Sequence, residues 1–216
     1  MKKFAVILAG SGVYDGSEIQ EAVLTMLAIT KSGAAYECFA PDINQYHVIN
    51  HLTGQETVET RNVLIESARI ARGKVKKLKE FSTEDFDAVI FPGGFGVAKN
   101  LCTFAIDGPD CLVNPVVEKA IVKSFDAKLP IGALCISPAL IAKVLGSATL
   151  TIGTDAATAN AIESLGAVHQ NTEGSDIVID LKNKIVTSPC YMHDTTIDIV
   201  AAGAENTVNA LLKLMD

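Results

Sequence analysis

A short apolar run leads into a helical pattern in Leu129-Pro130-Ile131-Gly132-Ala133-Leu134-Cys135-Ile136-Ser137-Pro138-Ala139-Leu140. The run is of strand length, and Pro138 suits the first helical turn, where its missing N–H would have had no partner. Cys135 therefore lies at a strand-to-helix elbow and faces the positive end of a helix dipole. This position is predicted to lower the thiol pKa and to favour a nucleophilic thiolate. A plain core role for Cys135 stays open, because free cysteines are often buried as small apolar residues.

Apolar runs of strand length alternate with longer helical patterns along the rest of the chain. This alternation is typical of parallel strands joined by crossover helices, so we expect an α/β fold in which a doubly wound, mostly parallel sheet forms the middle of three α/β/α layers. The predicted strands are 4–9, 35–40, 88–91, 131–134, 149–152 and 184–188, and the predicted helices are 17–31, 61–72, 115–127, 138–145, 156–165 and 195–214. Two β-rich runs, 177–180 and 184–187, predict an antiparallel hairpin late in the chain.

Length and composition narrow the class of protein. The chain has 216 residues, of which 49% are hydrophobic, so it can bury a core as one domain spanning 1–216. The net charge of −7 disfavours a nucleic-acid partner. No apolar run approaches the roughly 20 residues that cross a bilayer, so no membrane partner is expected. Five cysteines without a C-x-x-C pair indicate reduced thiols, a cytoplasmic location and no metal site.

A glycine pair follows another predicted strand, in Phe91-Pro92-Gly93-Gly94-Phe95-Gly96. The carboxyl ends of parallel strands open on one edge of a sheet, where ligands bind, so this turn is predicted to lie near Cys135. Without side chains, Gly93 and Gly94 let backbone N–H groups approach a ligand oxygen, and the N–H of Ile136 could point to the same place as an oxyanion donor. Taken alone, the glycine pair also fits a plain turn.

The first predicted strand ends at the same edge. Ser17 is a candidate N-cap for the helix that follows, and Glu21 lies near the first turn, where a carboxylate offsets the helix dipole. Glu18 could serve the same purpose. Alternatively, Glu18 leans over the sheet edge toward Cys135 and relays protons, which makes it the candidate proton-transfer residue.

Five runs along the chain carry a resemblance to a known family. They are Gly12-Val13-Tyr14-Asp15-Gly16-Ser17-Glu18-Ile19, Val48-Ile49-Asn50-His51-Leu52-Thr53-Gly54, Glu59-Thr60-Arg61-Asn62-Val63-Leu64-Ile65-Glu66, Pro92-Gly93-Gly94-Phe95-Gly96 and Thr151-Ile152-Gly153-Thr154-Asp155. In these runs the chain resembles the ElbB family of glyoxalase-like proteins, also called isoprenoid biosynthesis proteins, within the superfamily of PfpI-like and Parkinsonism-associated deglycase proteins. The resemblance implies a class I glutamine amidotransferase-like, flavodoxin-like fold. It also implies Cys135 as nucleophile with Glu18 as its carboxylate partner, and Gly94 and Ile136 as oxyanion donors.

Two departures from the superfamily concern histidine. Its protease-like members carry His directly after the nucleophile, where this chain has Ile136. Glutamine amidotransferases use a late His-x-Glu pair, whereas Thr195 stands two residues after His193 here. The usual triad is therefore incomplete, and His193 remains a candidate at the site because it follows a strand that should reach the same edge.

The resemblance implies a cofactor-independent, glyoxalase-like enzyme. Its substrate would be a small dicarbonyl such as glyoxal or methylglyoxal, converted to a hydroxy acid through a hemithioacetal on Cys135. No metal, nucleotide or thiol cofactor is expected, and related proteins are often dimers, so we expect a homodimer. The link to isoprenoid synthesis comes from the family label alone.

Three alternatives stay open. Cys135 could be oxidised in a redox sensor or binding module without turnover. The chain could be a glutamine-hydrolysing subunit. It could also be a nucleotide-dependent oxidoreductase, as Gly10 and Gly12 after the first strand suggest, although Gly16 falls one residue late for G-x-G-x-x-G.

Overall fold

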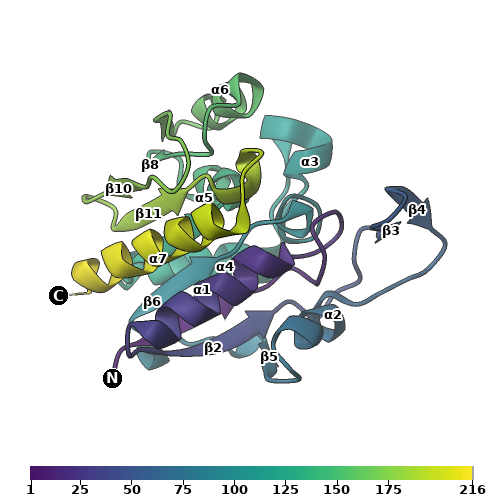
Figure 1. The fold of residues 1–216 in the computed structure, drawn as a ribbon, viewed down its shortest axis with the longest axis horizontal. Coiled ribbons are helices and arrows are strands. Elements are labelled where there is room, and N and C mark those ends of the chain that lie inside the picture. Colours follow the sequence, from purple (N-terminus) through teal and green to yellow (C-terminus); the bar gives the residue numbers. More distant parts are fainter. Residues whose placement is uncertain (216) are drawn as a thin grey trace.

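The architecture is a twisted sheet between two layers of helices, seen in a computed structural model that describes residues 1–215 (Figure 1). Within these residues the main sheet has seven strands in the order β10-β11-β7-β6-β1-β2-β5. Their bounds are β1 (Lys3–Ile7), β2 (Ala35–Ala40), β5 (Val75–Lys77), β6 (Ala88–Phe91), β7 (Ile131–Leu134), β10 (Val178–Asp180) and β11 (Ile185–Ser188). All neighbours pair in parallel except β10 and β11. The predicted mostly parallel sheet and late hairpin are confirmed.

Helices cover both faces of this sheet. On one face lie α1 (Ile19–Lys31), α2 (Val63–Ile70) and α7 (Ile197–Leu214), and on the other lie α4 (Pro115–Asp126) and α5 (Ser137–Leu145) (Figure 1). Strand β1 shows why two cores form. Phe4 and Val6 pack with α1 and α7, while Ala5 and Ile7 point to the opposite face and pack with α4 and α5. The predicted three layers are confirmed, and no helix in residues 1–215 is both long and apolar enough to cross a membrane.

The segment predicted as a strand over 149–152 does not join the main sheet. Instead β8 (Thr149–Leu150) pairs with β9 (Val168–His169) in a separate two-stranded parallel sheet, which flanks α6 (Ala156–Ser164). Side chains, and not a backbone ladder, tie this segment to the late hairpin. The Thr149 N–H donates to an Asp180 carboxylate oxygen at 2.8 Å, and the Thr151 N–H donates to the Thr187 hydroxyl at 2.9 Å.

The long connections contain short elements of their own. A small antiparallel hairpin, β3 (Val48–Asn50) with β4 (Gln55–Thr57), extends away from the body of the molecule (Figure 1). A turn of π-helix (Val97–Leu101) and the short helix α3 (Phe104–Asp107) follow β6. The predicted domain, 1–216, also includes Asp216, which lies outside the described residues.

The strand order reverses between β1 and β6. From β1 the chain continues outward to β2, and from β6 it continues in the opposite direction to β7. In doubly wound sheets, ligands bind beyond the carboxyl ends of the strands at this point. The loops that leave β1, β6 and β7 meet there, and they carry most of the candidate site residues.

Candidate functional site

Cys135 occupies the sharp turn between β7 and α5. Its φ of +57° lies in the left-handed region, which is uncommon for a residue with a side chain and is the geometry of a nucleophile elbow. The Cys135 N–H donates to the Ser188 carbonyl of β11 at 2.9 Å, which holds the turn against the sheet. The backbone N–H groups of Gly94 and Ile136 lie close enough to the Cys135 sulfur to lower its pKa. The structure thus brings these three residues together as the sequence predicts.

The carboxylate beside Cys135 belongs to Glu21. This side chain is fully buried, and it lies close enough to the Cys135 thiol for each group to shift the pKa of the other. Its Oε2 accepts the Gly93 N–H at 2.8 Å, and its Oε1 accepts the Tyr191 N–H at 3.1 Å. Glu21 is therefore held rigidly by two loops that are far apart in the sequence, and its orientation toward Cys135 is fixed.

Glu18, the residue favoured by the sequence, is engaged elsewhere. It is the N-cap of α1, and its Oε2 accepts the Glu21 N–H at 2.6 Å. Ser17 does not cap this helix, because its hydroxyl accepts the Ala9 N–H at 2.8 Å. The expected lean of Glu18 over Cys135 is thus contradicted by the hydrogen bond that Glu18 makes with its own helix.

A signal in the sequence could have identified Glu21. The buried face of α1 includes Glu21, Thr25 and Ala28, at the three- and four-residue spacing of one helical stripe. A carboxylate in register with a buried stripe has to be neutralised or hydrogen-bonded, so it is a better candidate than a carboxylate at the helix start.

The two glycines after β6 have different roles. The Gly93 N–H donates to Glu21, so the predicted contribution of Gly93 to an oxyanion site is not supported. Position 93 requires glycine because there is no room for a side chain between Cys135 and Glu21. A Cβ on Gly93 would lie 2.9 Å from the Cys135 sulfur and 2.6 Å from Glu21 Oε2. Gly94 has a φ of +101°, a conformation that glycine adopts readily, and this conformation turns its N–H toward the sulfur.

Burial dominates the protonation of the pair. It raises the pKa of Glu21 from 4.5 to about 8, although the N–H donors of Tyr191 and Gly93 act to lower this pKa. Burial, followed by the charge of Glu21, raises the pKa of Cys135 well above its ordinary value, although the N–H groups of Gly94 and Ile136 act in the opposite direction. The lowered thiol pKa expected from the helix dipole is therefore wrong. Below about pH 8 the pair is a thiol beside a carboxylic acid, and the first proton lost leaves one proton between them.

The raised pKa of Glu21 predicts that stability falls as the pH rises. A carboxyl whose pKa is higher in the folded than in the unfolded state stabilises the fold fully below pH 4.5, and this contribution is lost as the pH rises through about 8. At about 1.4 kcal/mol per pKa unit the loss is a few kcal/mol. The free energy of unfolding, measured in urea at several pH values across this interval, should fall with rising pH in wild type. In Glu21→Gln its dependence on pH should be much shallower. Equal slopes would contradict a neutral, buried Glu21.

His193 does not reach the pair. Its Nε2 lies 3.0 Å from the Thr172 carbonyl oxygen, and its ring packs against Gly153. Within residues 1–215, no hydrogen bond joins His193 to Cys135 or Glu21. The structure therefore does not bring this candidate to the site, whereas the N–H of Tyr191, two residues earlier, does contact Glu21.

A small hollow lies over the Cys135 sulfur. Its volume is about 310 Å³, at the lower end of the range for ligand pockets. The lining residues are Val13, Gly94, Phe95, Cys135, Ile136, Thr158, Tyr191 and Met192. They come from loops that follow β1, β6 and β7, from α6 and from the turn of 3₁₀ helix Cys190–Met192. The hollow therefore lies at the sheet edge that the topology selects.

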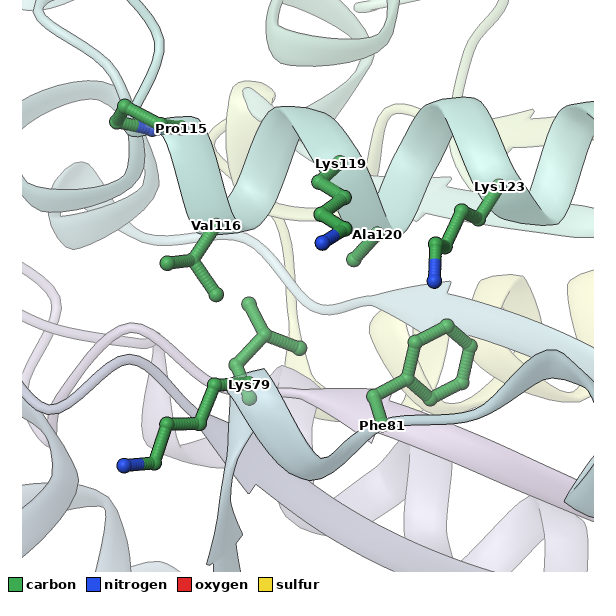
Figure 2. A pocket seen from close by; sticks show the side chains of 8 residues that line it. Lys79, Phe81, Pro115, Val116, Lys119, Ala120 and Lys123 are labelled. Atoms are coloured by element: carbon green, nitrogen blue, oxygen red, sulfur yellow. The ribbon is translucent and has the colours of Figure 1, made fainter.

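A second hollow lies far from this chemistry. It is formed between α4 and the 3₁₀ turn Leu78–Glu80, and Lys79, Lys119 and Lys123 surround it (Figure 2). Its described lining residues include no cysteine, histidine or carboxylate, so it offers no nucleophile or proton carrier. In residues 1–215 no cluster of three or more His, Cys, Asp or Glu is arranged to hold a metal ion.

Known proteins resemble the chain over nearly its whole length, although no family model matches it. It is 46% identical over 222 residues to glutamine amidotransferase-like class 1 domain-containing protein 3, mitochondrial, of Homo sapiens, an alignment that covers 98% of this chain and 83% of that protein. It is 36% identical over 208 residues to the ES1 protein, mitochondrial, of Danio rerio, covering 88% and 77%. Both relatives are named as mitochondrial proteins, which contradicts the cytoplasmic location that we expected.

Solved structures agree with these relatives. The isoprenoid biosynthesis protein with amidotransferase-like domain from Ehrlichia chaffeensis matches with a TM-score of 0.94 and 37% identity, over 100% of both chains. The predicted resemblance to the ElbB proteins and the predicted fold are thereby confirmed. Glyoxalase III from Candida albicans matches with a TM-score of 0.63 and 15% identity, over 100% of this chain and 98% of that one, which is a likeness of fold alone.

Proposed function

This chain belongs to the family of glutamine amidotransferase-like class 1 domain-containing protein 3 and the ES1 proteins, and we propose that it is a cofactor-independent, glyoxalase-like enzyme with Cys135 as its nucleophile. The observation that carries the proposal is the buried Glu21 carboxylate beside the Cys135 thiol beneath a small hollow, with two backbone N–H groups close to the sulfur. In this proposal Glu21 takes the proton-transfer role that the sequence suggested for Glu18.

The first step joins the sulfur to the aldehyde carbon of a 2-oxoaldehyde. The Glu21 carboxylate takes the thiol proton, the Cys135 sulfur forms a bond to the aldehyde carbon, and the carbonyl electron pair moves to oxygen. The N–H groups of Gly94 and Ile136 lie close enough to stabilise that oxygen as it becomes charged. Glu21 then returns the proton to the oxygen, which completes a hemithioacetal.

The second step moves hydrogen between the two carbons. Glu21 removes the proton from the former aldehyde carbon and returns it to the neighbouring carbon by way of an enediol. In the same step the hydroxyl proton on the former aldehyde carbon passes to the former ketone oxygen, which leaves a thioester of the hydroxy acid. Water then hydrolyses the thioester and restores the Cys135 thiol. The sum is one 2-oxoaldehyde plus one water giving one 2-hydroxy acid, so methylglyoxal yields lactate and glyoxal yields glycolate.

The alternatives are less well supported by the geometry. A glutamine-hydrolysing reaction would need a histidine at the nucleophile, and His193 is bonded elsewhere. A dinucleotide phosphate at the start of α1 would meet the Glu18 carboxylate that already caps this helix, which disfavours a nucleotide-dependent oxidoreductase.

The homodimer also stays part of the proposal. The hairpin formed by β3 and β4 and the chain beyond it expose Leu52 and Val58 almost completely, as arms that pair two subunits often do.

The test is the conversion of methylglyoxal by the purified protein without added thiol, metal or nucleotide. We expect lactate to appear in step with the loss of methylglyoxal, with many turnovers per protein chain. A protein that produces no lactate, releases no ammonia from glutamine, and loses only the Cys135 thiol to peroxide would contradict the proposal and favour a redox sensor.

A further inference from the structure

The hollow over Cys135 contains no charged side chain among its described lining residues. Val13, Phe95, Ile136 and Met192 supply apolar side chains, and Thr158 and Tyr191 are uncharged polar residues of the lining. A carboxylate or phosphate on a substrate would therefore leave water without meeting a cation. Burying such a charge unpaired is costly, whereas an apolar substituent gains from the same surface.

The ionisable groups beneath the hollow are acidic. Glu21 carries a negative charge whenever the reacting pair has lost its first proton, and Glu18 lies one helical turn away. The two oriented N–H groups of Gly94 and Ile136 can neutralise one charge, and in the proposed reaction that charge is the developing oxyanion. A second negative charge on the substrate would remain uncompensated.

A nearby lysine is held away from the hollow. The Lys99 ammonium donates to the Tyr14 carbonyl at 3.0 Å and lies 3.0 Å from His47 Nε2. It also stands over the Phe95 ring, 4.9 Å from its centre, and it is not among the described residues that line the hollow. Elsewhere the chain places lysines beside a hollow, at Lys79, Lys119 and Lys123 (Figure 2), whereas the described lining of the hollow at Cys135 has no lysine or arginine.

We propose that this site selects uncharged 2-oxoaldehydes with an apolar substituent and rejects those that carry a carboxylate or phosphate. The inference rests on the proposed function, and it names the substrate class of the same site. The volume of about 310 Å³ is at the lower end of the range for ligand pockets, which favours a small substrate.

One experiment compares two substrates that differ in a single charge. We expect kcat/KM for 4-carboxyphenylglyoxal to be at least about tenfold below that for phenylglyoxal, because about 1.4 kcal/mol of unpaired charge suffices for a factor of ten. Equal values would overturn the inference and leave the proposed function standing. Loss of all turnover would overturn the proposed function, and the inference would then be decided by the following measurement.

The rate of Cys135 alkylation tests the lining without any turnover. Neutral iodoacetamide and anionic iodoacetate are compared on the wild-type protein by peptide mass spectrometry, with glutathione as the reference thiol. The iodoacetamide-to-iodoacetate rate ratio at Cys135 should exceed that of glutathione by at least about tenfold. An equal or smaller ratio would overturn the inference.

Phe95 offers a matched pair of variants, because its ring is 46% exposed and its replacement should leave the fold intact. Phe95→Arg places a cation at the edge of the hollow and should lower the iodoacetamide-to-iodoacetate rate ratio at Cys135 several-fold. Phe95→Gln, which adds no charge, should leave the ratio near that of wild type. A similar fall in both variants would show that ring size and not charge controls access, contrary to the inference.

Discussion

Replacing Cys135 with alanine is expected to abolish the conversion of methylglyoxal to lactate, a loss of at least about 10⁴-fold in kcat/KM. Without the sulfur no covalent bond forms, and neither the N–H groups of Gly94 and Ile136 nor the Glu21 carboxyl can replace it. Alanine keeps the backbone turn and removes one sulfur atom, so the variant should fold.

The matched control is Cys38→Ala. Cys38 is a buried thiol of β2 on the far side of β1 from the site, and its sulfur contacts the Met26 sulfur at 3.6 Å. This variant should lose some stability and keep kcat/KM within a few-fold of wild type, as measured by lactate formation and by thermal melting. Comparable activity in Cys135→Ala would remove the proposed mechanism, because no other cysteine lines the described hollow.

The fold and the elbow could be predicted because local patterns determine them. The run from Ile131 to Leu134 is apolar at every position of a strand buried on both faces, and Pro138 fits only the first turn of the helix that follows. The segment from Thr149 to Ile152 alternates threonine with aliphatic residues and is also predicted as a strand of the main sheet, but β8 lies outside that sheet. Its partners are side chains of the late hairpin, and no local pattern reveals such partners.

The sequence points to Glu18 and not to Glu21 as the carboxylate beside Cys135 because of the position at which one helix begins. The sequence predicts a start at Ser17, but the helix begins at Ile19 with Glu18 as its cap. Glu18 therefore has the extended backbone of an N-cap, whereas Glu21 lies in the first turn on the buried face of the helix. The direction of the Cys135 pKa shift was missed for another reason, since the depth of burial depends on tertiary packing that local sequence does not contain.

Because Glu21, and not Glu18, lies beside Cys135, replacing Glu21 should have the second large effect on kcat/KM. Glu21→Gln is expected to lower kcat/KM by about 10²- to 10⁴-fold, because the amide can neither take the thiol proton nor carry hydrogen between carbons. Glu18→Gln keeps an amide oxygen that can cap α1, so it should stay within a few-fold of wild type. Both variants are compared with wild type for lactate formation, after their folding has been checked by circular dichroism.

The pH profile separates catalysis by Glu21 from mere support of the structure. The active form of the pair has lost one proton, so kcat/KM of wild type should rise as the pH increases through about 8, where Glu21 titrates. It should fall again only when the thiol is also deprotonated, well above the ordinary thiol pKa. In Glu21→Gln the limb at about pH 8 should disappear, whereas a purely structural role would lower the rate and leave that limb in place. A profile that loses this limb in Glu18→Gln instead would return the proton-transfer role to Glu18, despite its hydrogen bond to the start of its own helix.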